Sequence, residues 1–317
     1  MPVNDLEKNI IATLCFYDLF DKPLTNFELY KYLINYSGHT NQNLSFFGLI
    51  EVLKNNHSLK KIIDFEDGFY YFKDKKNIVR ERIKKEKVSI NKWRKTKKVA
   101  KILQKLPYVK MVGITGSLAI NNTKSLSDLD FFIVVKASRI WLGRLIATLV
   151  IHLSGQRRYG QKIKDRACLN SYIADQSLKI ETRDLYSASE YFHLIPLVDY
   201  NIYIKFKKAN SWIGKYFLFP KYDQSKNQRI ITSNSLFSPL IEFLEYILDN
   251  KIGDRIEQFV ARYQKRRIIR NPATNWQNSQ IIFNDKCLIF HPIPKAPVIK
   301  KGYEANLKRY SAILNND

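Results

Sequence analysis

The segment from Gly113 to Val135, GITGSLAINNTKSLSDLDFFIVV, constrains the fold of this chain more than any other. It joins two apolar, strand-like runs through a Gly-Ser pair, and ten residues separate that pair from an Asp-Leu-Asp triplet. This order predicts two core strands with a turn and a short helix between them. Asp-x-Asp alone is common at the edges of surface strands, so its meaning depends on the small residues that precede it.

The acidic residues of the triplet are Asp128 and Asp130. Side chains two positions apart on a β-strand project from the same face, so we expect the two carboxylates to share one site. Two neighbouring carboxylates repel and raise each other's pKa unless a cation is present. Mg²⁺ is the expected cation, because it prefers oxygen ligands and keeps waters and substrate phosphates in its shell.

The Gly-Ser pair, Gly116 and Ser117, stands where the first strand ends and the short helix begins. Glycine lets backbone N–H groups approach an anion closely, and a helix N-terminus adds a favourable dipole. The serine hydroxyl can donate another hydrogen bond to a phosphate oxygen. Together with the two carboxylates, the pair predicts a site for a nucleoside triphosphate and its metal ions, as phosphoryl or nucleotidyl transfer requires.

In this combination, residues 113–135 resemble the signature of the DNA polymerase β-like nucleotidyltransferase superfamily. The resemblance covers the motif and the core around it, not the whole chain. It implies that Gly116 and Ser117 hold the triphosphate and that Asp128 and Asp130 ligate two Mg²⁺ ions.

The superfamily normally adds a third carboxylate on the next strand of the sheet. The corresponding strand here is ACLNSYIAD, residues 167–175, which lacks an acid between apolar neighbours. Asn170 is the best-placed polar residue of this strand, and Asp165 and Asp175 at its two ends are the alternatives. An amide can bind Mg²⁺ weakly but cannot act as a base at neutral pH, so the third position decides whether the chain is catalytic.

The segment before this core predicts three helices and a hairpin. Residues 4–20 have helical apolar spacing, and Thr25 and Glu28 stand in the relation of a capping box before the second helix. The third helix is expected in residues 44–56, and Glu-Asp-Gly at 66–68 signals the hairpin turn. This order resembles a winged helix-turn-helix.

The rest of the chain is predicted to be a Lys- and Arg-rich helix, the core, and a helical region. Helices are expected at 182–206, 235–250, 252–269 and 301–313, with one hairpin that turns at Asn284-Asp285. The expected fold class is α+β, with a small mixed-sheet nucleotidyltransferase core between two other domains. The predicted divisions are a winged-helix-like domain, a basic connecting helix, the core and a helical C-terminal domain, at 1–75, 76–107, 108–181 and 182–317.

The charge of the chain indicates a polyanionic partner. Lys and Arg number 53 against 29 Asp and Glu, a formal net charge of +24. The third N-terminal helix lacks Arg, Gln and Asn in its first half, so sequence-specific reading of DNA is not expected. Further basic clusters lie at 157–160 and 262–271. Contacts with phosphates are therefore expected, with RNA favoured over DNA.

The three cysteines have no zinc-ligand spacing and their odd number argues against a disulfide framework, which favours the reduced cytoplasm. The most apolar run, residues 140–153, is too short to span a membrane and contains Arg144 and His152. No membrane partner is expected.

These observations predict a Mg²⁺-dependent enzyme that transfers an NMP from an NTP to an acceptor hydroxyl. RNA is the favoured acceptor, with tRNA among the candidates, and a protein or a small molecule is the alternative. The competing hypothesis is a catalytically impaired nucleotidyltransferase fold that acts as a nucleic-acid-binding or regulatory protein.

Overall fold

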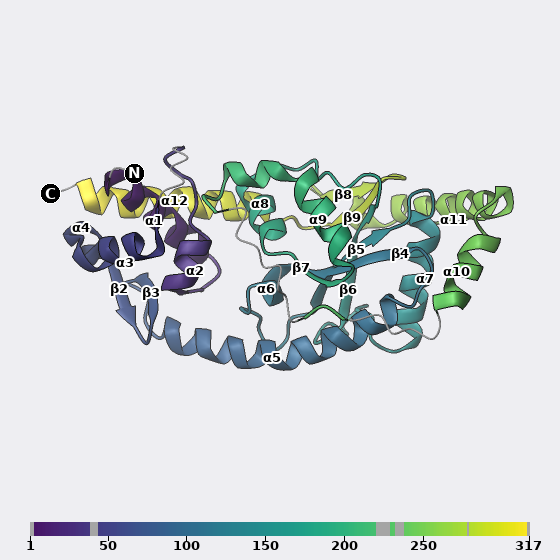
Figure 1. Ribbon diagram of the computed structural model, residues 1–317, viewed down its shortest axis with the longest axis horizontal. Helices are drawn as coiled ribbons and strands as arrows, with labels where there is room; N and C mark the ends of the chain where they lie inside the picture. Colours follow the sequence, from purple (N-terminus) through teal and green to yellow (C-terminus); the bar gives the residue numbers. More distant parts are fainter. Residues whose placement is uncertain (1–2, 39–43, 220–228, 232–237, 278, 316–317) are drawn as a thin grey trace.

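The computed structural model describes residues 3–38, 44–219, 229–231, 238–277 and 279–315. Figure 1 shows an elongated molecule, with a small N-terminal region at one end and a larger region built on a β-sheet at the other. Two long helices connect these regions. The fold class expected from the sequence, α+β with a mixed sheet and additional helical parts, is confirmed.

In its described residues, the N-terminal region contains four helices and a three-stranded sheet in the order β1-β3-β2. The predicted capping box is present, since the Glu28 N–H donates to the Thr25 hydroxyl and the Thr25 N–H donates to the Glu28 carboxylate. The predicted hairpin is confirmed, whereas the short helix α4 was not expected. The winged-helix assignment stays a prediction. The elements are α1 (Val3–Asp18), β1 (Leu24–Thr25), α2 (Asn26–Lys31), α3 (Phe46–Asn55), α4 (His57–Ile62), β2 (Ile63–Glu66) and β3 (Phe69–Phe72).

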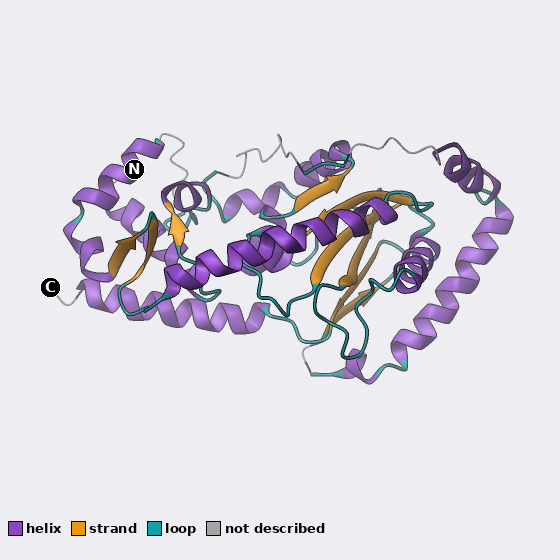
Figure 2. Ribbon diagram, turned by 90° about the horizontal axis from the view of Figure 1, so that it is seen from below, coloured by secondary structure: helices purple, strands orange, loops and turns teal. Residues whose placement is uncertain are grey.

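The basic connecting helix is α5 (Ile78–Leu103), which runs from the N-terminal region to the sheet (Figure 2). Some of its cations are buried instead of solvated. The Arg82 guanidinium forms an ion pair with Glu28, 2.9 Å away, and the Lys92 ammonium donates to Asp165 at 2.7 Å. Because a buried charge is stable only with a partner, these pairs fix α5 to the segments at its two ends.

The larger region is built on a six-stranded sheet in the order β7-β4-β5-β6-β9-β8. Only the pair β5–β6 is parallel, because α7 crosses between these two strands and its apolar side packs on the sheet. The chain enters through β4 (Val109–Ile114), α6 (Gly116–Ala119), β5 (Leu129–Val135), α7 (Ile140–Leu153) and β6 (Ala167–Ala174), as the sequence predicts.

Three strands of this sheet come from residues beyond 181. The continuous helix expected at 182–206 is wrong, because β7 (Ile195–Val198) separates α8 (Leu185–Phe192) from α9 (Tyr200–Ala209). β7 pairs with β4 at one edge of the sheet, where Pro196 is tolerated although it lacks an N–H group. The predicted hairpin is confirmed as β8 (Gln280–Phe283) and β9 (Cys287–His291), and β9 extends the sheet from β6.

The remaining helices cover one end of the sheet and return to the N-terminal region. α10 (Ser238–Ile247) and α11 (Lys251–Ile269) follow the expected ranges, although residues 235–237 of the first range lie outside the described residues. α12 (Ala296–Asn315) is longer than expected and lies against α1 (Figure 1). There the Tyr310 ring stacks on Phe72, with 3.5 Å between ring centroids.

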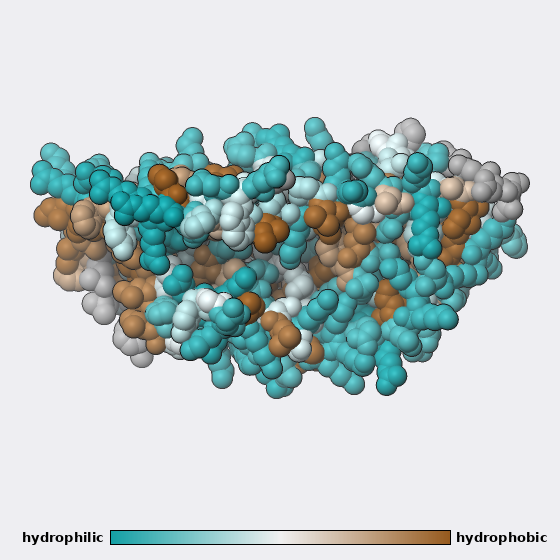
Figure 3. All heavy atoms as spheres, turned by 180° about the vertical axis from the view of Figure 1, so that it is seen from behind, coloured by the Kyte–Doolittle hydropathy of each residue, from teal (hydrophilic) through white to brown (hydrophobic). Residues whose placement is uncertain are grey.

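Exposed apolar side chains collect at the end of the molecule formed by α10 and α11. Ile252, Phe259 and Tyr263 are all more than half exposed along one face of α11, and Figure 3 shows hydrophobic surface at this end. The opposite face of α11 packs on α7. None of the helices in the described ranges combines the length and apolar character that crossing a bilayer demands.

Candidate nucleotide and metal site

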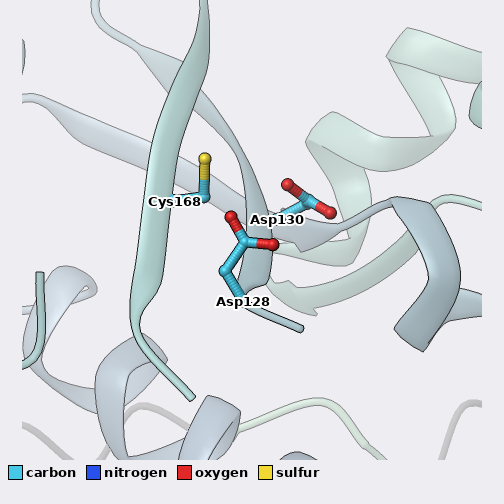
Figure 4. Close-up of side chains that lie close together, drawn as sticks. All are labelled: Asp128, Asp130 and Cys168. Carbon is cyan, nitrogen blue, oxygen red and sulfur yellow. The ribbon is translucent and has the colours of Figure 1, made fainter. Parts of the chain in front are cut away.

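The predicted carboxylate pair lies at the start of β5. Asp128 directly precedes this strand and Asp130 is its second residue. One ligand atom from each of them and the Cys168 sulfur on β6 lie within 4.8 Å of one another, and Figure 4 shows the three side chains together. The structure therefore brings Asp128 and Asp130 to one place, as the sequence predicts.

The electrostatics of this pair favour a bound cation. Burial, together with the neighbouring carboxylates of Asp128 and Glu190, raises the pKa of Asp130 to about 7. Coordination of a divalent cation would remove this repulsion and keep both carboxylates ionised. Burial also raises the pKa of the Cys168 thiol, so this side chain is a protonated neighbour at neutral pH. Two carboxylates with oxygen donors fit Mg²⁺.

The Gly-Ser turn has a backbone that requires glycine. Gly116 has a φ of +67°, and a Cβ atom at this position would lie 2.6 Å from Asp130 Oδ2. Its N–H donates to Glu190 Oε1 at 2.7 Å. Ser117 is the next residue of α6, half-buried, and its carbonyl accepts the Asn122 N–H. The turn is thus pressed against the carboxylate pair, with its first N–H already bound to an anionic group.

A basic side chain also contacts the pair. Arg158 Nη1 lies 2.5 Å from Asp128 Oδ2 and 3.6 Å from the Cys168 sulfur. Arg158 belongs to the basic segment between α7 and β6, which the sequence marks only as a cluster at 157–160. This guanidinium partly neutralises Asp128, the same task that a metal ion would perform.

Two residues of β6, Cys168 and Asn170, lie near the place where the superfamily has its third carboxylate. Cys168 pairs with Asp130 in the parallel register, and Ser171 pairs with Phe132. Leu169 and Asn170 therefore both stand opposite a single residue of β5, which is a bulge. Asn170 lines the same hollow as the carboxylate pair, while Cys168 is the β6 side chain beside Asp130. A metal-binding role for Asn170 stays a prediction.

The two alternative carboxylates are placed elsewhere. Both Asp165 oxygens accept from lysines of α5, at 2.7 Å from Lys92 and 2.6 Å from Lys95. Asp175 accepts the Ala137 N–H at 2.8 Å, at the opposite end of β6. Each has a local structural partner, and neither joins Asp128 and Asp130.

Glu190 on α8 is a site residue that the sequence did not indicate. It supplies the oxygen that accepts the Gly116 N–H, and its charge reaches Asp130. The sequence places it in a predicted helix without showing which face would meet the Gly-Ser turn, so the signal for it was absent. It is the third carboxylate of the site, and it comes from a helix instead of a neighbouring strand.

A hollow of about 1130 Å³ joins these groups to the C-terminal region. Its walls come from α6, β5, β6, α7, α8, β9 and α11. Lys179, Arg267 and Lys295 line it together with the carboxylates. The hollow is large enough for a nucleotide together with part of an acceptor.

Comparison with known protein families identifies the same part of the chain. Residues 96–197 match the family model of the nucleotidyltransferase domain. The match runs from the end of α5 through β7 and includes Gly116, Asp128, Asp130 and Glu190. It confirms the resemblance of the core and extends it past residue 181, while the N-terminal region lies outside it. No curated protein and no solved structure matches the chain.

The residues that match the nucleotidyltransferase domain thus include the Gly-Ser turn, both aspartates and the carboxylate on α8. The C-terminal strands β8 and β9 complete its sheet from outside the matched residues. A transferase that uses an NTP is the activity that this domain indicates.

Proposed function

We propose that this chain is a metal-dependent nucleotidyltransferase that transfers an NMP from an NTP to an acceptor hydroxyl. The observation that carries the proposal is the close packing of the Gly116 turn against the Asp128–Asp130 pair, within a region that matches the nucleotidyltransferase domain. A triphosphate at the turn would place its phosphates directly beside the two carboxylates.

In the proposed reaction, the acceptor oxygen forms a bond to the α-phosphorus. The bond from that phosphorus to the bridging oxygen breaks, and pyrophosphate leaves with the electron pair. Asp128 and Asp130 would hold two Mg²⁺ ions, which when bound stabilise the attacking and leaving oxygens. Gly116 and Ser117 would hold the triphosphate, and the Gly116 N–H must first be released from Glu190.

The acceptor hydroxyl also has to lose its proton. Asn170 has no basic atom at neutral pH, and Asp128 and Asp130 are assigned to the metal ions. Glu190 is the remaining carboxylate at the turn, and release from the Gly116 N–H leaves it able to accept the proton. We assign Glu190 the role of general base.

RNA is the acceptor that the charge distribution favours. The net charge of +24 attracts polyanions, and several cations line the hollow beside the carboxylate pair. The N-terminal region, with the hairpin β2–β3 and the basic helix α5 behind it, would contact phosphates without reading bases. A protein or small-molecule acceptor is the alternative. The free thiols Cys15 and Cys168 fit the cytoplasm as the compartment.

Two experiments test the proposal. Calorimetric titration of ATP or CTP with Mg²⁺ should detect binding to the wild type and not to Asp128→Ala. Incubation with labelled NTPs and bulk RNA should transfer label to the RNA, and Asp130→Ala should abolish the transfer. Nucleotide binding without any transfer would favour the regulatory alternative, and the absence of metal-dependent binding would exclude the enzyme.

A further inference from the structure

Three arginines from three different elements line the hollow on the side away from the Gly-Ser turn. Arg144 lies on α7, Arg157 lies in the segment between α7 and β6, and Arg267 lies on α11. Arg157 directly precedes Arg158, which contacts Asp128, whereas the charge of Arg157 acts on Arg144. We call these three residues the arginine cluster.

Within the described part of the chain, Arg144 contacts neutral groups. Its guanidinium lies over the Phe290 ring of β9, 4.5 Å from the ring centroid, and donates to the side-chain oxygen of Gln264 on α11. Gln264 is held in turn, since its amide nitrogen donates to the Trp141 carbonyl at 2.8 Å. The Nε atom of Arg144 is buried without a hydrogen-bond partner. The position of Arg144 is thus fixed by groups that do not neutralise it.

The charges of the cluster repel one another. The pKa of Arg144 is lowered mainly by burial, and the positive charges of Arg157 and Arg267 lower it further. Among the residues that the structure describes, no carboxylate forms an ion pair with any of the three. Two neighbouring cations differ in this respect, since Arg158 pairs with Asp128 and Lys265 pairs with Asp285. Converging guanidiniums without a carboxylate are suited to a phosphate, which they bind through several N–H groups at once.

The sheet separates the arginine cluster from the carboxylate pair. Asp130 shares a face of β5 with Phe132, which packs on Tyr191 of α8. Arg144 lies on α7, which packs on the opposite face of the sheet together with Phe290. The arginine cluster and the carboxylate pair therefore lie on different faces of the sheet, and the hollow connects them.

We propose that Arg144, Arg157 and Arg267 form a binding site for a phosphate of the RNA acceptor, away from the hydroxyl that receives the NMP. The proposal rests on the proposed function for the identity of the acceptor. It assigns the two sides of the hollow different substrates, with the NTP at the Gly-Ser turn and the RNA backbone at the arginine cluster.

The test measures binding of a short fluorescein-labelled RNA by anisotropy, without metal or NTP. The double variant Arg157→Gln/Arg267→Gln leaves the packed Arg144 in place, and Arg255→Gln/Arg262→Gln is the matched control. The control residues are exposed arginines of α11 outside the hollow, so both variants lose the same charge. We expect RNA affinity to fall about tenfold or more in the first variant and about twofold or less in the control. The dependence of log K on log salt should lose about one unit of slope in the first variant only.

Nucleotide binding distinguishes the two proposals. Titration with Mg²⁺-ATP should give unchanged affinity in Arg157→Gln/Arg267→Gln, whereas Asp128→Ala should lose nucleotide and retain RNA. Equal loss of RNA affinity in the double variant and its control would overturn the acceptor site. Loss of Mg²⁺-ATP with RNA affinity retained would also overturn it, because the cluster would then serve the nucleotide. If Asp128→Ala binds nucleotide normally, the proposed function fails while the RNA result still stands.

Discussion

The two sides of the candidate site differ in how the chain assembles them. The side at β4 and β5 comes from one continuous segment, residues 113–135, which carries the Gly-Ser turn and both aspartates. The other side combines β6, α8, β9 and α11, which are far apart in sequence. The first side keeps the features expected of a nucleotidyltransferase. The second side has Cys168 beside Asp130, and the third carboxylate of the site, Glu190, comes from α8. We call the first side the local half and the second side the assembled half. The local half thus follows the family pattern, and the assembled half departs from it.

The largest effect is expected from the local half. Replacement of Asp130 by alanine should lower label transfer on the order of 10²- to 10³-fold, because it removes a ligand of the proposed metal ions. Transfer is measured with labelled NTPs and bulk RNA. Asp67→Asn, at the exposed hairpin turn, is the control and should transfer label normally. Equal rates in Asp130→Ala and wild type would remove the pair from the mechanism.

In the assembled half, replacement of Glu190 should reduce the transfer rate almost as much, because Glu190 is the proposed general base. Glu190→Gln should lower the transfer rate about 100-fold. Its affinity for Mg²⁺-NTP should be unchanged or higher, because a neutral amide repels the phosphates less than a carboxylate does. Rates come from single-turnover assays, and affinities from calorimetry.

Glu181→Gln is the control for this prediction, because Glu181 also lines the hollow and has no assigned role. A Glu190→Gln variant that transfers label at the wild-type rate would return the question of the base to the third strand.

The packing of the turn against Asp130 can be tested with a single methyl group. Gly116→Ala should weaken nucleotide binding by roughly tenfold and destabilise the fold by about 1–3 kcal/mol, since it adds a clash with Asp130 to an unfavourable positive φ. Gly155→Ala is matched in backbone, because Gly155 has a φ of +69° with nothing within 4 Å of the added Cβ. It should show the backbone effect alone. The melting temperature and nucleotide affinity of both variants are measured. Equal changes in Gly116→Ala and Gly155→Ala would mean that the contact with Asp130 is unimportant.

The smallest effect is expected from restoring an acid on the third strand. Cys168→Asp places a carboxylate beside Asp130 and should raise Mg²⁺ affinity by up to about tenfold, because it completes a set of three oxygen donors. Without metal the added charge should destabilise the fold through repulsion. Melting curves with EDTA and with Mg²⁺ should therefore differ more for Cys168→Asp than for wild type. The matched variant Asn170→Asp should show a smaller difference, since Asn170 lies in the bulge and Cys168 is the residue that pairs with Asp130. The reverse order would identify Asn170 as the third-strand ligand.

Sequence reasoning located the local half and the neighbouring strand β6 correctly. Apolar runs predicted β4, β5 and β6, and spacing alone placed Asp128 and Asp130 together, because side chains two apart on a strand share a face. It failed at β7, where a short apolar run that contains Pro196 was assigned to a helix. Such a run has no periodicity that separates a buried strand from a helix, and its pairing with β4 is a contact between distant segments.

The same limit applies to the third carboxylate. Residues 113–135 specify a turn, two carboxylates and the strands that hold them, because all of these depend on neighbours along the chain. The identity of their partners depends on which segments the fold packs against them. That packing places Glu190 at Gly116, turns Asp165 toward the lysines of α5, and gathers three arginines from α7, α11 and the basic segment between α7 and β6. Interactions between residues far apart in sequence have no local signature, so these partners emerge only when the chain is folded.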